Sequence, residues 1–187
     1  MDPQIPDTDL IVLLDDSGRE IGTAPKLASH HATTPLHKAF SCYIFDEQGR
    51  FLVTQRAHTK KVWPSVWTNS VCGHPAPGES YEAAIARRAD YELGMTVRDI
   101  AVIVSDYRYA TPPYNGIVEN EICPVFAARL ATNFQVNPDE VEAFRWILWA
   151  NYVADIATHP NTYSYWAKDQ LPHLLQSADF LHYTRPA

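Results

Sequence analysis

The stretch between residues 73 and 95 constrains the fold more than any other part of this 187-residue sequence. It starts with a loop-forming run rich in proline and glycine, continues through an alanine-rich segment at 79–93, and reaches Gly94. Alanine is the strongest helix former, and a glycine directly after the last helical residue is a common C-cap. The stretch therefore predicts a loop, a helix over 79–93 and a second loop.

Residues at set intervals in this stretch match the Nudix signature, which places a glycine, a glutamate and an arginine ahead of a final glutamate–x–glycine. The matching residues are Gly73, Glu79, Arg87, Ala89, Glu92, Gly94 and Met95. A match at so many spaced positions is far more specific than a lone glycine motif. The resemblance to Nudix proteins implies an α/β (α+β) fold, a Nudix-like α/β/α sandwich with a mixed sheet.

Two departures from the signature concern its chemistry. Arg88 and Tyr91 stand where Nudix hydrolases carry metal-binding carboxylates. Of the signature's carboxylates on this part of the helix, only Glu92 is present. Hydrolysis by metal-activated water needs several carboxylates around the metal. We therefore predict a Nudix-like fold that has lost diphosphohydrolase activity. The alternative is an ordinary amphipathic surface helix.

The rest of the chain reads mainly as short strands joined by turns, with no repeat and no domain boundary. The predicted strands are 10–14, 19–23, 39–45, 50–54, 100–109, 117–129 and 141–148. Asp46-Glu47-Gln48-Gly49 predicts a hairpin, residues 26–34 a short helix or loop, and residues 152–175 two helices broken near Pro160. We expect one domain over 1–187, with a core at about 10–150 and a C-terminal helical extension at 151–187.

Composition and charge narrow the class of protein. The formal net charge of −7 argues against nucleic acid as a partner, because binding to a phosphate backbone needs clustered lysine and arginine. Cys42, Cys72 and Cys123 form no CxxC pair, which favours free thiols in a reducing compartment. The acidic segment 1–9 does not resemble a signal peptide, and no apolar run has membrane-spanning length. We predict a cytoplasmic protein without a membrane partner.

Histidines and glutamates outside the helix form a second candidate set. Glu119 and Glu121 are two residues apart, so in a strand they point to the same face. With His30, His37 and His74 they make a nitrogen and oxygen donor set that suits Mn²⁺, Mg²⁺ or Zn²⁺. Spacing alone does not bring the five together. For each histidine a surface or core role is the alternative, and for the glutamates a solvated face.

Two longer runs carry a closer resemblance. Residues 67–75, Trp-Thr-Asn-Ser-Val-Cys-Gly-His-Pro, resemble the cysteine motif of type 1 isopentenyl-diphosphate isomerases. Residues 116–126, Gly-Ile-Val-Glu-Asn-Glu-Ile-Cys-Pro-Val-Phe, resemble the glutamate motif of the same family. Shorter runs at 36–40 and 91–94 also fit, and the resemblance covers about residues 10–166.

The resemblance implies roles for individual residues. One divalent metal would be held by His30, His37, His74, Glu119 and Glu121. A second ion, Mg²⁺ arriving with the diphosphate, would be held by Glu92 and the backbone carbonyl of Cys72. The diphosphate would contact Lys26, Arg56 and Lys60. His31, adjacent to His30, is an alternative ligand.

The implied reaction moves a double bond of isopentenyl diphosphate by adding one proton and removing another, which gives dimethylallyl diphosphate. Cys72 and Glu121 would be the proton-transfer pair, assisted by Tyr109. An aromatic face stabilises a carbocation by about 0.5–2 kcal/mol, and Trp166, which the resemblance implies lines the hydrocarbon pocket, and Trp67 are candidates. Without the motif, Cys72 reads as a small buried hydrophobe, Arg56 and Lys60 as surface charges, and Tyr109 as a core aromatic.

Two other functions compete with isomerisation. One is a Nudix diphosphohydrolase, and the other is a catalytically inert Nudix module that binds a metal or a nucleotide. The substitutions Arg88 and Tyr91 argue against the hydrolase. The combination of Cys72, Tyr109 and Glu121 argues against the inert module, which needs no acid–base pair. The sequence leaves open a monomer or a homodimer, the native metal, the source pathway and the role of the C-terminal tail.

Overall fold

The computed structural model describes residues 10–132 and 134–187, so the acidic segment 1–9 lies outside the described residues. The strands are β1 (Leu10–Leu14), β2 (Glu20–Pro25), β3 (His37–Lys38), β4 (Phe40–Phe45), β5 (Arg50–Arg56), β6 (Trp67–Thr68), β7 (Val71–Gly73), β8 (Val97–Val104), β9 (Arg108–Ala110), β10 (Asn120–Ile122), β11 (Val125–Leu130) and β12 (Val141–Leu148). The helices are α1 (Lys26–Ser29), α2 (Tyr81–Leu93), α3 (Trp149–Thr158), α4 (Tyr165–Gln176) and α5 (Ala178–Tyr183), with a 3₁₀ turn at Pro160–Thr162.

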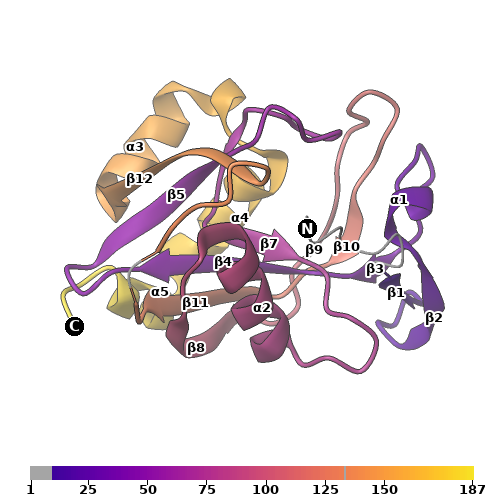
Figure 1. Cartoon of the computed structure of the whole chain (residues 1–187), viewed down its shortest axis with the longest axis horizontal. Coiled ribbons are helices and arrows are strands. Elements are labelled where there is room, and N and C mark those ends of the chain that lie inside the picture. Colours follow the sequence, from indigo (N-terminus) through magenta and orange to yellow (C-terminus); the bar gives the residue numbers. More distant parts are fainter. Residues whose placement is uncertain (1–9, 133) are drawn as a thin grey trace, which may run out of the picture.

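The larger sheet has the strand order β12-β5-β4-β11-β8 and is covered on both faces. Every residue of β4 is buried, and alternate side chains point to opposite faces of a strand. Cys42 and Ile44 pack with residues of α2, while Tyr43 and Phe45 pack with residues of α3, α4 and α5. In Figure 1, α2 lies in front of β4 and β11 and α5 lies behind them. The predicted α/β/α sandwich with a mixed sheet is therefore confirmed.

The turn at 46–49 forms, but the predicted hairpin around it is wrong beyond the first pair. The Asp46 carboxylate accepts hydrogen bonds from the backbone N–H of Gln48 at 3.0 Å and of Arg50 at 2.8 Å. β4 and β5 then pair only at Phe45 and Phe51 before they diverge. The resulting fork is filled by β6 and β7, which pair with β5 and β4 respectively.

Two of the predicted long strands are each divided between two sheets. The strand predicted at 117–129 breaks at Cys123 and Pro124, because proline has no N–H to donate to a ladder. The strand predicted at 100–109 likewise ends at Val104 and resumes as β9. The strands β3, β9 and β10 therefore join a smaller sheet, ordered β2-β1-β3-β10-β9, at the other end of the molecule (Figure 1).

Helix α2 confirms the predicted helix and begins at Tyr81. The Ser80 hydroxyl caps its N-terminus by accepting from the N–H of Ala83 at 3.2 Å. Gly94 ends the helix with φ of 57°, and a Cβ there would lie 2.7 Å from the carbonyl oxygen of Gln135. That position therefore requires glycine.

The C-terminal region is helical, with the predicted break near Pro160. Helix α5 lies beyond the two helices predicted at 152–175 but within the predicted helical extension at 151–187, and its Phe180 is fully buried against Tyr43, Phe45 and Trp149. No helix within residues 10–132 and 134–187 is long and apolar enough to span a membrane.

Candidate active site

One cavity collects nearly all the predicted site residues. Those lining it are Lys26, His30, Arg56, Lys60, Cys72, His74, Glu92, Tyr109, Glu119, Glu121 and Trp166. His37 is fully buried and lies behind this lining. The lining comes from both sheets, from α1, α2 and α4, and from the loops between them. The cavity therefore depends on segments that are far apart in the sequence.

Strand register brings three of these side chains side by side. Glu121 on β10 is the direct partner of His37 on β3 and of Tyr109 on β9. Residues directly opposite one another in neighbouring strands point to the same face of the sheet. The Tyr109 hydroxyl accordingly donates to Glu121 Oε2 at 2.8 Å, and Glu121 Oε1 lies 3.5 Å from His37 Nε2.

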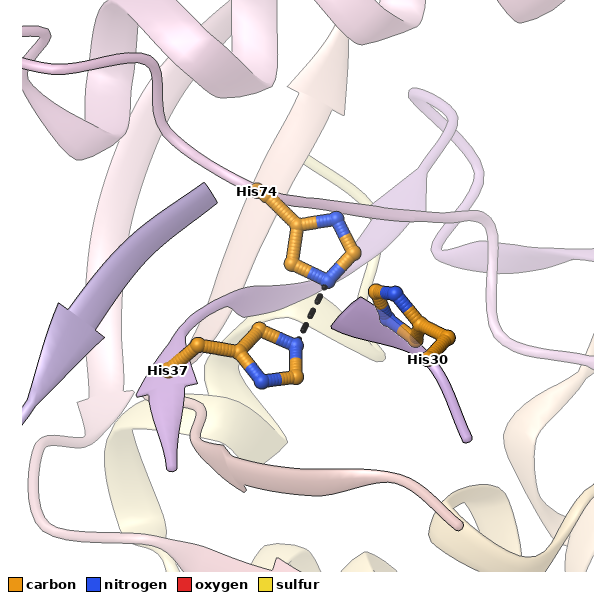
Figure 2. Close-up of side chains that lie close together, drawn as sticks. All are labelled: His30, His37 and His74. Atoms are coloured by element: carbon orange, nitrogen blue, oxygen red, sulfur yellow. Dashed lines mark hydrogen bonds between the residues drawn. The ribbon is translucent and has the colours of Figure 1, made fainter. Parts of the chain in front are cut away.

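Three histidine rings converge beside these carboxylates. Figure 2 shows His30, His37 and His74 turned toward one another, and Nε2 of His37 lies 3.1 Å from Nε2 of His74. His74 Nε2 is also 3.1 Å from Glu121 Oε1, and His30 Nε2 is 3.3 Å from Glu119 Oε2. Two overlapping groups, His30–His37–His74 and His37–Glu119–Glu121, each have all their ligand atoms within 4.8 Å of one another.

Hydrogen bonds at the Nδ1 atoms of two of these histidines make the cluster suitable for binding a cation. Nδ1 of His30 lies 2.6 Å from the Lys26 carbonyl oxygen, and Nδ1 of His37 lies 2.9 Å from that of Pro35. A carbonyl only accepts, so each Nδ1 carries the ring proton in the neutral form. The Nε2 lone pairs then face one another and the carboxylates. Lone pairs that converge in this way suit a divalent metal, and such carbonyl contacts orient metal-binding histidines.

At His74 and Glu121 the electrostatics favour the protonation states that a metal needs. Burial lowers the pKa of His74 to about 3, against an opposing effect of Glu121. Burial also acts to raise the pKa of Glu121, but the adjacent His37 and His74 imidazoles outweigh it and hold that pKa well below its usual range. A neutral imidazole and an ionised carboxylate are the metal-binding forms of both groups.

Cys72 lies on β7, directly paired with Ser41 of β4. Its Sγ lies 3.0 Å from Asn69 Oδ1 and 3.5 Å from Ser41 Oγ. Burial raises the pKa of the thiol to about 12, so the neutral thiol prevails at pH 7. The cavity therefore holds a protonated thiol and an ionised carboxylate, one acid and one base.

A second group of charged residues in the cavity lining surrounds Glu92. Glu92 Oε1 accepts from Arg88 Nε at 2.8 Å, and Arg88 Nη2 lies 3.3 Å from Glu140 Oε2. Lys60 forms an ion pair with the same Glu140 carboxylate. Burial raises the pKa of Glu92 despite the neighbouring Arg88. Two carboxylates and two cations therefore share this part of the cavity.

The other predicted cationic and aromatic residues lie on the same cavity. The Arg56 guanidinium donates to the carbonyl oxygens of Trp63 at 3.1 Å and Val62 at 3.0 Å. It also lies 5.8 Å from the ring centre of Trp166. Lys26 is the first residue of α1, which directly follows β2 of the smaller sheet, and it lines the cavity.

Trp67 does not line the cavity, contrary to the prediction that it is a candidate for its aromatic wall. Its ring face lies 4.0 Å from the Arg145 guanidinium, so a cation already occupies that face. His31, the alternative to His30, points away: its Nδ1 accepts from the N–H of Thr33 at 3.1 Å.

Arg88 and Glu140 also line the cavity, and neither is among the site residues predicted from the sequence. Arg88 stands at a position where Nudix hydrolases carry a carboxylate, and an arginine on a cavity-facing helix is itself a signal for an anion. Glu140 precedes β12 and has no spacing relationship to Glu92. Only the packing of β12 beside β5 brings it to Lys60 and Arg88.

Two signature residues fix the loop that carries His74. Arg87 forms a two-pronged pair with Glu79, through Nε at 2.8 Å and Nη2 at 2.7 Å. Arg87 Nη2 also donates to the His74 carbonyl oxygen at 3.2 Å, and Glu79 accepts from the N–H of Ala76. These residues tie the loop to α2 and so set the position of His74.

Comparisons with solved structures show the fold. The crystal structure of DR0079 from Deinococcus radiodurans matches with a TM-score of 0.62 and 18% identity, over 81% of this chain and 90% of that one. A MutT protein from Methanosarcina mazei matches with a TM-score of 0.51 and 20% identity, over 64% and 82%.

Comparisons of sequence show the family. The NUDIX domain model matches residues 35–169. An isopentenyl-diphosphate Delta-isomerase from Mycolicibacterium vanbaalenii is 47% identical over 96% of this chain and 98% of its own length. Relatives of the same name from Saccharopolyspora erythraea and Klebsiella pneumoniae are 47% and 48% identical, over 89% and 83% of this chain and 86% and 85% of their own lengths. The chain therefore belongs to the NUDIX family and, within it, to the isopentenyl-diphosphate Delta-isomerases.

Proposed function

We propose that this protein interconverts isopentenyl diphosphate and dimethylallyl diphosphate by a 1,3-proton shift in isoprenoid biosynthesis. The observation that carries the proposal is the meeting of Cys72, Glu121 and Tyr109 on one cavity, in a chain whose relatives bear that isomerase name. The reaction has to add a proton to one carbon of an allylic unit and remove one from another. An acid and a base on the same cavity meet that need.

The proton-transfer pair is Cys72 and Glu121. The Cys72 thiol is neutral and the Glu121 carboxylate is ionised, so one supplies a proton while the other receives one. Tyr109 donates to Glu121 Oε2, and burial keeps its pKa well above the usual range, so its hydroxyl stays a donor. Tyr109 therefore steadies the charged form of Glu121. Because the reaction is reversible, the two residues exchange roles: the acid of one direction is the base of the other.

The metal ligands are His30, His37, His74, Glu119 and Glu121, which hold one divalent ion, with Mn²⁺, Mg²⁺ and Zn²⁺ as candidates. A bound divalent cation supplies a fixed positive charge that tunes the acidity of the carboxyl group beside it. Support comes from the converging Nε2 atoms and carboxylate oxygens of this cluster. Glu92 and the carbonyl oxygen of Cys72 hold a second ion, Mg²⁺, which accompanies the diphosphate.

The substrate divides between two ends of the cavity. Lys26, Arg56 and Lys60 bind its diphosphate, since their positive charges line the cavity. Trp166, whose side chain is buried at the cavity wall, lies against the hydrocarbon. An aromatic face stabilises a developing carbocation without a nucleophile that would trap it. The aromatic wall also excludes water, which would quench such a cation.

The protein works in the cytoplasm, acts on a small molecule and needs no nucleic acid or membrane, as a monomer or a homodimer. Support comes from its three cysteines, which are free thiols, as expected in a reducing compartment. The chain acts as one domain over 1–187, and the hydrophobic core that α4 and α5 share with β4 and β5 supports this for the described residues.

A proton NMR time course in D₂O tests the function. Purified protein is mixed with isopentenyl diphosphate and Mg²⁺, with and without prior chelation. We expect dimethylallyl diphosphate that carries deuterium, and loss of the reaction on chelation. Released phosphate would instead favour a diphosphohydrolase, and no reaction by fully metal-loaded protein would favour an inert Nudix module.

The hydrolase is the second candidate, because Glu140 brings another carboxylate next to Glu92. Arg88 lies between the two, however, and Lys60 pairs with Glu140. Both carboxylates already pair with cations of the protein, and Glu92 is the one carboxylate of the two proposed to hold a metal, the Mg²⁺ that accompanies the diphosphate. This arrangement favours holding a diphosphate over activating water with a metal cluster.

A further inference from the structure

One buried amide connects the two sides of the cavity wall. Asn69 lies in the fork between β4 and β5, and its side chain has no exposed surface. Its Oδ1 atom accepts from three donors, the Cys72 thiol, the Trp166 indole N–H and the Thr68 hydroxyl, each at 3.0 Å. The acceptor is therefore shared by the proposed proton-transfer thiol and the proposed aromatic wall.

The other end of the amide fixes its orientation. Asn69 Nδ2 donates to the carbonyl oxygens of Cys42 at 3.1 Å and Val71 at 3.0 Å. A carbonyl oxygen only accepts, and an indole N–H only donates. A flipped amide would set oxygen against two carbonyls and N–H against the Trp166 N–H. The network therefore allows only one orientation, with Oδ1 toward Cys72 and Trp166.

The backbone carbonyls that accept from the Asn69 amide belong to the strands that form the fork. Cys42 lies on β4 and Val71 on β7, and these two residues are direct partners in the β4–β7 pairing. Asn69 therefore ties the side chains of Cys72 and Trp166 to the most buried part of the larger sheet. Trp166 sits on α4, nearly a hundred residues further along the chain, so this hydrogen bond also fixes the helix against the fork.

We propose that Asn69 is the positioning residue of the isomerisation, which sets the Cys72 thiol and the Trp166 indole relative to each other. This inference rests on the proposed function. A proton has to leave or reach carbon along a narrow approach while the aromatic face lies beside the developing charge. Holding both groups on one oxygen atom fixes their separation before substrate arrives. Asn69 itself acts through these two side chains.

The test compares Asn69→Ala with Ser70→Ala, a matched control from the next position. Ser70 is equally buried and also bridges the fork, because its hydroxyl accepts from the N–H of Ile44 at 2.8 Å and donates to the Leu52 carbonyl at 2.6 Å. These contacts hold backbone alone. Both variants therefore lose buried hydrogen bonds, but only one loses the tie between Cys72 and Trp166.

The measurements are kcat and KM for isopentenyl diphosphate, with melting temperature and bound metal as controls. For Asn69→Ala we expect kcat to fall by about 10- to 100-fold, the size of effect that follows a misplaced catalytic group. KM and metal content should stay within about 3-fold of wild type, because neither the diphosphate side chains nor the histidine cluster touch Asn69. Ser70→Ala should lower the melting temperature and keep kcat within about 3-fold of wild type.

Two results would overturn the inference: a folded Asn69→Ala variant with wild-type kcat, or an equal fall in kcat for Ser70→Ala. If Asn69→Ala does not fold, Asn69→Ser replaces it under the same criteria. Serine removes fewer hydrogen-bonding groups than alanine does, because it keeps a hydroxyl and leaves room for water. Rescue of kcat by Asn69→Asp, whose buried and neutral acid keeps the acceptor oxygen, gives an independent check. A wild-type protein with no isomerase activity would remove the proposed function instead, and that result is seen before any variant is compared.

Discussion

Glu121 and His37 are direct partners in the parallel pairing of β10 with β3, and Glu121 Oε1 lies 3.5 Å from His37 Nε2. The same register pairs Glu121 with Tyr109 on its other side. A slip of one residue would turn Glu121 to the opposite face of the sheet. The carboxylate is thus placed by strand register, at the point where the two sheets meet.

Replacing Glu121 by glutamine should abolish most of the isomerisation. The amide keeps the shape but neither accepts a proton nor carries charge, so kcat should fall by about 10²- to 10⁴-fold. Turnover is measured by NMR and folding by circular dichroism. Glu82→Gln, an exposed position on α2, is the matched control and should keep full activity. Near-normal turnover of Glu121→Gln would exclude it as a member of the proton-transfer pair.

The neighbouring histidines 30 and 31 should differ sharply in metal binding. His30 Nε2 faces Glu119, whereas His31 bonds to its own loop. A ligand that binds the native state stabilises it according to its concentration over its Kd, by about 2.7 kcal/mol at 100 times Kd. We expect Mn²⁺, Mg²⁺ or Zn²⁺ to raise the melting temperature of wild type and of His31→Ala. His30→Ala should show a smaller rise at the same metal concentration, and an equal rise would count against His30 as a ligand.

The metal-free protein should lose stability in acid partly through His74. Its pKa falls from the ordinary value near 6.5 to about 3 on folding, because of burial. A lowered pKa means that the unfolded chain binds the proton first, so this stability is present above pH 6.5 and is lost as the pH falls toward 3. The slope from this group is at most about 1.4 kcal/mol per pH unit. Urea titrations of chelated wild type and His74→Asn should give a shallower slope for the variant. Equal slopes would show that His74 does not titrate in this window.

Helix α5 should unfold together with the rest of the core. Phe180 is fully buried and packs edge-on against Tyr43 and Trp149. Phe180→Ala should therefore lower the free energy of unfolding by about 3–5 kcal/mol, the range for a large aromatic removed from a core. Leu175→Ala, at a position 43% exposed on the neighbouring helix α4, is the control and should change it little. Urea unfolding of Phe180→Ala in a separate early transition would argue against one cooperative unit over the chain.

The sequence by itself determined the local and motif-borne features. Helix α2 follows from alanine-rich residues between a serine cap and Gly94, all of which act within a few residues of one another. The strands β1, β4, β5 and β12 follow from apolar runs between turn residues. The candidate residues Cys72, His74, Glu119 and Glu121 were found through their motifs, and they meet on one cavity.

Tertiary structure alone decided the rest. The Asp46 turn reads as a hairpin, but β4 pairs with β7 and β11, and such long-range pairing has no local signal. Glu140 reaches Arg88 across 52 residues, and Trp67 turns its face to Arg145. Propensity and spacing act over a few residues, whereas register, strand exchange between sheets and side-chain packing depend on contacts between segments far apart in the chain. The sequence therefore supplied the chemical groups of the site, and packing decided which of them face one another.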